Sequence, residues 1–171
     1  MTSRTLYLLR HAKSSWSDDD VADHDRPLAP RGEEAVERLR RHLADAGIAP
    51  DLVLCSSARR TVMTLDGVAP AIPDATVLVE PGLYGASSDR LLRRLHDVDH
   101  TVASVMLIGH NPGLELLAHL LIGRGAADLR RRAEAKFPTG ALAELAFEGA
   151  WRNLARGGAS LESFVVPRDL R

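Results

Sequence analysis

The sequence predicts an α/β protein with three layers, in which helices cover both faces of a mostly parallel central sheet. Short apolar runs alternate with amphipathic segments along the chain, and each run has the length of a buried strand. This alternation is typical of strand–helix–strand units whose strands lie parallel. The 171 residues fit one domain over 1–171.

Composition and charge exclude several classes of protein. Hydrophobic residues make up 45% and charged residues 26% of the chain, and the formal net charge is -1, so no nucleic acid or membrane partner is expected. The single cysteine, Cys55, allows no intrachain disulfide. The apolar run 6–9 ends at Arg10 and is too short for a signal peptide or a membrane span. We therefore expect a cytoplasmic protein.

The first strand and the first helix are predicted at 5–9 and from Pro30 onward. A polar loop, 13–25, separates them. Proline is favoured at the first helical position, and Gly47 is a suitable helix stop. Apolar residues recur in this helix at spacings of three and four: Val36, Leu39, Leu43 and Ala46.

The remaining elements repeat the pattern. Further strands are predicted at 52–55, 76–79 and 105–108, and further helices at 59–68, from Ser88 onward, and at 112–122. Two late apolar segments, 142–147 and 161–166, are predicted to add strands at the edge of the sheet. The Arg- and Ala-rich stretch 123–135 is predicted to form a charged surface turn and helix.

Histidines and arginines follow the ends of three predicted strands. Arg10 and His11 follow the first strand, Arg59 and Arg60 come one turn after the second, and His110 follows the fourth. Because ligands bind beyond the carboxyl ends of parallel strands, we expect these side chains to converge. Two histidines are a poor metal site, since zinc takes three or four protein ligands.

Arginine forks match phosphate oxygens, and helices that begin after the strands add N–H groups. The pattern therefore indicates a phosphate site with no metal or other cofactor. A neutral histidine could attack phosphorus, because cationic neighbours lower the pKa of imidazole and keep it neutral.

These segments resemble the histidine phosphatase superfamily, in particular its SixA-type phosphohistidine phosphatases. The matching motifs occur in the expected order and cover nearly the whole chain: LYLLRHAKSSW, DHDRPLAPRG, CSSARRTVMT, GLYGASSDRLL, LIGHNPGLELLAHLL and FVVPRDL. The resemblance implies a phosphoglycerate mutase-like fold and a metal-independent phosphatase that works through a phosphohistidine.

The resemblance also implies roles for individual residues. His11 corresponds to the nucleophile, and Arg59 to a rim or surface position. The family's serine, arginine and threonine, four apart, correspond to Ser56, Arg60 and Thr64. The implied catalytic residues are His11, Arg10, Arg60 and His110. The implied phosphate ligands are Arg10, Arg60, His110, Arg26 and Ser14.

Three positions depart from the family pattern. Ser17 stands where larger members have asparagine, and Ala29 cannot cap the following helix, although Pro30 partly compensates. Glu80 lies one residue out of register with the glutamate that serves as general acid in mutase-like members. We expect Asp23 as the first and Glu80 as the second candidate proton donor.

The expected substrate is a phosphorylated molecule, with a phosphohistidine-bearing protein as the leading choice. Imidazole leaves more easily than an alkoxide, so such a substrate needs less help from an acid, which is typically worth about two to four orders of magnitude. The alternatives are a small-molecule phosphomonoester phosphatase, a mutase, or a phosphate- or phosphopeptide-binding module. The intact His11 argues against the binding module.

Three further side chains are given no catalytic role. Trp16 is either a loop anchor or part of a lid. His24 is expected to be a solvent or capping residue in a loop near the site. Cys55 is expected to be a small buried residue.

Overall fold

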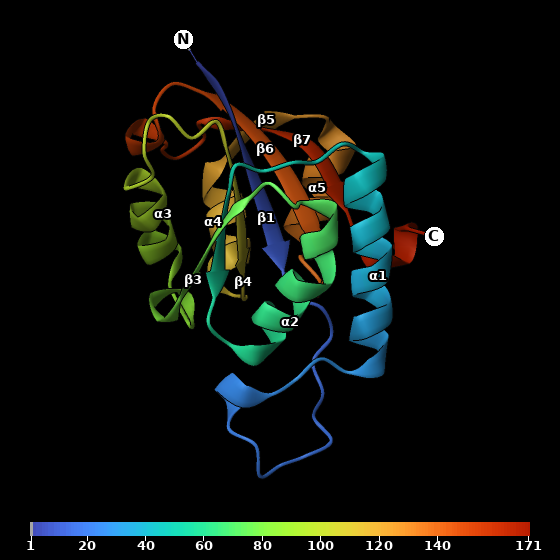
Figure 1. Cartoon of the computed structure of the whole chain (residues 1–171). Helices are drawn as coiled ribbons and strands as arrows, with labels where there is room; N and C mark the ends of the chain where they lie inside the picture. Colours follow the sequence, from blue (N-terminus) through green and yellow to red (C-terminus); the bar gives the residue numbers. More distant parts are fainter. Residues whose placement is uncertain (1) are drawn as a thin grey trace.

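The computed structural model describes residues 2–171 and shows a seven-stranded sheet between two layers of helices (Figure 1). The strand order is β3-β2-β4-β1-β6-β7-β5. The strands are β1 (Ser3–Arg10), β2 (Leu52–Ser56), β3 (Thr76–Glu80), β4 (Ser104–Gly109), β5 (Ile122–Gly125), β6 (Leu142–Glu148) and β7 (Ala159–Val165). The helices are α1 (Pro30–Asp45), α2 (Arg59–Val68), α3 (Ser88–His96), α4 (Gly113–Leu121) and α5 (Ala127–Ala135).

Strand direction confirms the mostly parallel sheet. β1, β2, β3 and β4 pair parallel with one another. β6 runs antiparallel to both β1 and β7, and β5 is parallel to β7. β6 is therefore the one strand of this sheet that runs in the opposite direction.

The predicted position of the last two strands is wrong. β6 and β7 were expected at the sheet edge, but β6 lies between β1 and β7, and the edges are β3 and β5. β5 was not predicted, because its four residues, IGRG, have no strand-like apolar pattern. β5 covers the outer side of β7. The stretch 123–135 therefore begins in a strand and continues into α5.

Alternation along β1 explains the two helical layers. Leu6 and Leu8 face the side covered by α3, α4 and α5, whereas Tyr7 and Leu9 face the side covered by α1 and α2. Successive strand residues point to opposite faces of a sheet. Each of these four side chains is buried. The three-layer α/β/α prediction is confirmed.

The starts of α1 and α3 are capped differently, and the start of α1 agrees with the prediction. Ala29 makes no side-chain cap, and Pro30 occupies the first turn of α1. At α3, by contrast, the hydroxyl of Ser87 accepts a hydrogen bond from the Arg90 N–H.

Among residues 2–171, no helix combines the length and the apolar character needed to cross a bilayer. Short 3-10 turns lie at Asp23–Asp25, Ala69–Ala71, Pro81–Leu83, Trp151–Asn153 and Pro167–Asp169.

Candidate active site

The ends of β1, β2 and β4 bring the predicted histidines together. Arg10, the last residue of β1, is in register with Gly109, the last residue of β4. His11 and His110 follow these two residues, and their ring centroids lie 5.3 Å apart. In Figure 1 the loop that follows β1 extends beyond the tip of this strand, beside the start of α2. The carboxyl ends of these strands and this loop supply the residues of the candidate site.

The backbone selects the tautomer of His11. Its ring is 6% exposed, and Nδ1 lies 2.7 Å from the carbonyl oxygen of Ala12. A carbonyl can only accept, so Nδ1 carries the proton and donates it. The lone pair of the neutral ring is therefore on Nε2, which is the atom needed for nucleophilic attack.

Burial keeps the His11 ring neutral. The pKa of His11 is lowered to about 4, and burial is the largest cause. The hydrogen bond to Ala12 opposes this shift, and the positive charges of Arg10, Arg60 and Arg26 contribute to it. At neutral pH, His11 is consequently uncharged and nucleophilic.

Backbone contacts hold the residues that follow His11. The N–H of Ala12 donates to Oγ1 of Thr64 over 3.1 Å, and this hydroxyl donates to the carbonyl of Arg60 over 2.8 Å. A Cβ on Gly32 would lie 2.1 Å from the carbonyl oxygen of Lys13. Only glycine therefore allows α1 to pack this closely against the segment after His11.

A hydroxyl orients His110. Nε2 of His110 lies 2.8 Å from Oγ of Ser56, and the same Oγ accepts a bond from the N–H of Ala58. Within the described chain, the Ser56 hydroxyl has no acceptor other than His110, so it donates to Nε2. Burial, followed by the charge of Arg60, lowers the pKa of His110 to about 3. The neutral ring then carries its proton on Nδ1, which is buried without a protein partner.

The three predicted phosphate-binding arginines leave N–H groups unused. Nη1 of Arg10 donates to the carbonyl of Phe137 over 3.1 Å, and Nη2 of Arg26 donates to Oγ of Ser14 over 3.2 Å. Arg10 Nε, Arg26 Nη1 and Arg60 Nε are buried and make no hydrogen bond within residues 2–171. Buried donors normally have partners, so this cluster suits a ligand rich in acceptor oxygens.

Asp23 places a carboxylate among these cations. It accepts hydrogen bonds from Tyr84 and Arg60 and lies 3.3 Å from Nε of Arg26. The hydrogen bond from Tyr84 is the largest of the effects that hold the pKa of Asp23 below its usual value, and Arg60 and Arg26 lower it further. Asp23 is therefore ionised at neutral pH in the unliganded protein.

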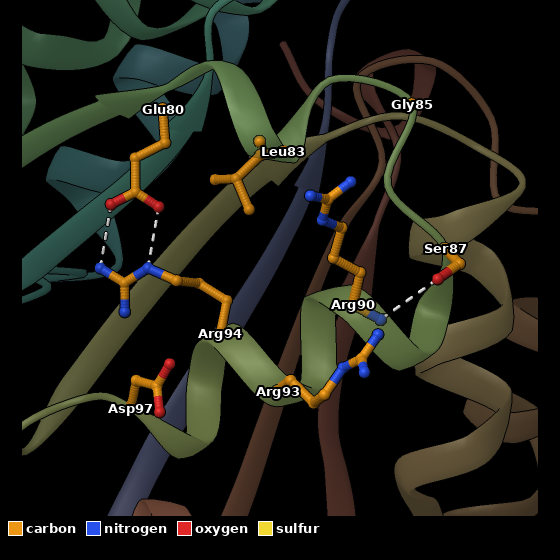
Figure 2. Close-up of a pocket in the computed structure, with 9 residues that line it drawn as sticks. Glu80, Leu83, Gly85, Ser87, Arg90, Arg93, Arg94 and Asp97 are labelled. Carbon is orange, nitrogen blue, oxygen red and sulfur yellow. Dashed lines mark hydrogen bonds and ion pairs between the residues drawn. The ribbon is translucent and has the colours of Figure 1, made fainter.

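Glu80, the second candidate donor, lies in a different environment. Its carboxylate makes two contacts with the guanidinium of Arg94, at 2.8 and 3.0 Å (Figure 2). The pair lines a groove of about 690 Å³ between the end of β3 and α3. The structure thus brings Asp23 into the histidine–arginine cluster and pairs Glu80 with a helix arginine.

Tyr84 lies near the cluster, although the sequence had indicated no role for it. The ring of Tyr84 packs edge-on against His110 and His24, with centroid distances of 5.6 and 4.8 Å. The ring of His24 also meets the Ser57 hydroxyl at 2.9 Å. The position of Tyr84, directly after the turn that follows β3, is the signal that could have identified it.

Trp16 and Arg59 lie at the outside of the site. The Trp16 side chain is 69% exposed, yet its ring centroid lies 3.3 Å from Cζ of Arg26. Trp16 therefore stacks on the outer face of this guanidinium. Arg59 is exposed, unlike its buried neighbour Arg60. Ser17 hydrogen-bonds only to Ser15 within the described residues.

No cluster of three or more His, Cys, Asp or Glu side chains in the part of the chain from 2 to 171 has a metal-binding arrangement. In the loop, the Asp18 carboxylate accepts a bond from the N–H of Asp20 and is exposed. Cys55 is fully buried, and burial raises the pKa of its thiol to about 12. These residues fill structural positions outside the cluster.

Comparisons with known proteins agree with this geometry. The model of the "Histidine phosphatase superfamily (branch 1)" matches residues 6–135. An uncharacterized protein of Mycobacterium tuberculosis (strain ATCC 25618 / H37Rv) is 37% identical over 164 residues, covering 94% of this chain and 100% of the relative.

Two solved structures have the same phosphoglycerate mutase-like fold. A protein of Nakamurella multipartitia, assigned by inference as the phosphohistidine phosphatase SixA, superposes with a TM-score of 0.85 at 31% identity, covering 98% of each chain. A protein of Agrobacterium tumefaciens with the same inferred assignment has a TM-score of 0.82 at 32% identity, covering 96% of this chain and 98% of that one.

Proposed function

This chain belongs to branch 1 of the histidine phosphatase superfamily, and on that premise we propose that it hydrolyses phosphoryl groups through a phosphohistidine on His11. The observation that carries the proposal is the free Nε2 of a neutral, buried His11 beside unpartnered arginine N–H groups. Such donors stabilise the charge that spreads over the oxygens of a transferring phosphoryl group.

In the first step, the lone pair on Nε2 of His11 attacks phosphorus, and the bond from phosphorus to the leaving group breaks. The leaving group takes the bonding pair. His11 becomes a phosphorylated imidazolium because Nδ1 keeps its proton, and the Ala12 carbonyl accepts the hydrogen bond from this charged ring. Arg10, Arg60 and the Nδ1–H of His110 bind the phosphoryl oxygens.

In the second step, water attacks phosphorus and the P–Nε2 bond breaks. The bonding pair returns to Nε2, and the protons of the water stay with the phosphate product or pass to solvent. His11 is then neutral again. No metal ion takes part in either step.

We propose a phosphohistidine on a protein as the substrate. A phosphoimidazole that is protonated on its second nitrogen leaves as neutral imidazole, so it needs no acid from the enzyme. This fits a site in which Asp23 is ionised and Glu80 is paired with Arg94. The exposure of Trp16 also suits access by a large substrate.

A phosphomonoester phosphatase is the second candidate, favoured by the position of Asp23. Its carboxylate contacts Arg60 and Arg26, both of which are proposed to bind phosphate. If phosphate binds Arg60 and Arg26 in place of the Asp23 carboxylate, the pKa of Asp23 rises. The carboxyl then becomes able to donate a proton to an alkoxide. Under this proposal, the same His11 chemistry acts on small esters.

Trapping the phosphoenzyme tests the proposal. Mixing the protein with a phosphohistidine peptide and quenching in alkali should leave an acid-labile phosphate on His11, identified by mass spectrometry of peptides. His11→Ala should abolish the label and lower kcat/KM by about four orders of magnitude or more. His42→Ala, on the outer part of α1, is the matched control. Label on another residue, or loss of activity with a chelator, would contradict the mechanism.

A further inference from the structure

A cationic groove of about 640 Å³ lies beside the candidate active site. We define it by the basic side chains in its walls. They come from the segment after β1, from α1, from α5 and from the turn after β7, and they are Lys13, Arg31, Arg38, Arg132, Lys136 and Arg168. Glu34 is the one acidic residue in the lining.

Two chain segments connect the cationic groove to the phosphate cluster. Lys13 follows His11 by two residues. On the opposite wall, the carbonyl of Phe137 accepts a bond from Arg10, and the N–H of Gly140 donates to the carbonyl of His11 over 2.9 Å. Lys136, Pro138 and Thr139 of the groove belong to this wall. The groove and the phosphate cluster are therefore built on the same two chain segments, which places the groove within reach of residues that flank a phosphoryl group at His11.

The charge of the cationic groove is largely uncompensated. Arg132 pairs with Asp169 at 2.7 Å, but the other five basic side chains have no ion pair within residues 2–171. The whole chain has a net charge of -1, so this concentration of positive charge is local. Arg31 lies in the first turn of α1, where the helix dipole disfavours a cation. A role in ligand binding explains why a cation, Arg31, stands at a position that the helix dipole disfavours.

The floor of the cationic groove is apolar. Ala35, Pro138 and Pro167 are half-buried and present apolar surface, while Phe164 and Val166 also line the groove but are only 4% exposed. A small inorganic anion would use only the cations. A peptide segment that combines carboxylates with apolar side chains would contact both the cations and the floor.

The groove in Figure 2 provides an internal comparison. It also contains basic residues, Arg90, Arg93 and Arg94, but these lie with the carboxylates of Glu80 and Asp97. Arg94 is already bound to Glu80. Basic residues on α3 are therefore largely balanced, whereas those of the cationic groove are not.

We propose that the cationic groove binds an acidic segment of the protein that carries the phosphoryl group. This inference rests on the proposed phosphohistidine phosphatase function. The charge complementarity and the shared wall with His11 make the groove a determinant of substrate choice. Surface charge of this kind speeds association and orients the substrate more than it changes the chemical step.

Three phosphorylated substrates separate groove binding from chemistry. The first is a phosphohistidine peptide flanked by four glutamates, the second is the same peptide with glutamines, and the third is phosphoramidate. At low salt, wild-type kcat/KM should be at least about tenfold higher for the glutamate peptide than for the glutamine peptide. Raising the ionic strength should reduce this preference, because the groove charges are solvent-exposed.

Charge reversal locates the preference. The double variant Arg31→Glu with Lys136→Glu should remove the preference for the glutamate peptide and leave phosphoramidate turnover unchanged. The matched control, Arg90→Glu with Arg93→Glu, changes the net charge by the same amount in the groove of Figure 2 and should keep the preference for the glutamate peptide.

The outcomes distinguish two failures. Phosphoramidate turnover without a glutamate preference, or a preference that survives reversal of Arg31 and Lys136, would overturn the groove inference alone. No turnover of any of the three substrates would overturn the proposed function together with it.

Discussion

The two halves of the candidate site are built differently. The strand-end half, Arg10, His11, Ser56 and His110, consists of buried or half-buried side chains held by backbone carbonyls or by each other. The loop half, Ser14, Trp16, Asp23 and Arg26, is held mainly by contacts between side chains. The Asp23 side chain is 53% exposed, whereas His11 is 6% exposed.

This difference separates chemistry from substrate contact. Groups that stabilise a transition state work best when their positions are set before the substrate binds. The strand-end half meets this condition. In the loop half, the carboxylate of Asp23 occupies N–H groups of Arg60 and Arg26, so the proposed phosphate binding would require this half to rearrange.

Removing one arginine from each half tests the difference most strongly. We expect Arg10→Ala to lower kcat/KM by about two to three orders of magnitude, because a preorganised donor is lost. Arg26→Ala should cost only about tenfold, because one charge-assisted hydrogen bond at an adjustable position is lost. Steady-state kinetics with a phosphohistidine peptide measures both, with exposed Arg59→Ala as the control. An equal decrease in kcat/KM for Arg10→Ala and Arg26→Ala would show that the two halves of the site do not differ in this way.

Asp23→Asn tests the loop half with two leaving groups. For an alkyl phosphate ester we expect kcat to fall by about two orders of magnitude, because the alkoxide loses its proton donor. For a phosphohistidine peptide kcat should stay within about threefold, because imidazole needs no donor. An equal decrease for both substrates would mean that Asp23 only positions Arg60 and Arg26.

The pH dependence of kcat/KM reports the strand-end half. The pKa of His11 is lowered to about 4, so the neutral, nucleophilic form persists as the pH falls through 6.5. Activity should decline by about tenfold per pH unit only below that pKa. NMR titration of the ring signals, assigned with His11→Ala, gives the pKa directly. A midpoint near 6.5 would contradict the burial argument.

Ser56→Ala tests the orientation of His110. Without the hydroxyl, Nε2 of His110 loses its donor, and the ring proton is no longer held on Nδ1. We expect about a tenfold decrease in kcat/KM, as for the loss of a buried hydrogen bond. Nitrogen NMR of His110 should show a change of tautomer, and Ser56→Thr should restore the wild-type spectrum. An unchanged tautomer would limit Ser56 to a structural role.

The smallest effect is expected at Trp16. Trp16→Ala removes the ring stacked on Arg26 and should raise KM by about threefold with little change in kcat, since an exposed cation–π contact is worth about 0.5–1 kcal/mol. The same measurement addresses whether Trp16 forms a lid. A large decrease in kcat would indicate that the loop closes over the reaction.

Local patterns account for the parts of the structure that were predicted well. Short apolar runs for the strands, and helical spacing or boundary residues for the helices, placed β1, β2, β4, α1 and α2 within a few residues of their observed ends. β5 was missed because IGRG has no apolar period. β6 was expected at an edge, but β7 and β5 pair beyond it and place it inside the sheet. Strand order is a long-range property that periodicity does not encode.

The sequence by itself determined that Arg10, His11 and His110 follow strand ends, and it therefore determined where a ligand site is to be expected. Only the tertiary structure decided the state of these groups. The tautomer of His11 depends on one carbonyl, that of His110 on Ser56, and the lowered pKa of Asp23 mainly on Tyr84, 61 residues away. Protonation responds to burial and to contacts at a few ångströms, and those arise only when distant segments pack together.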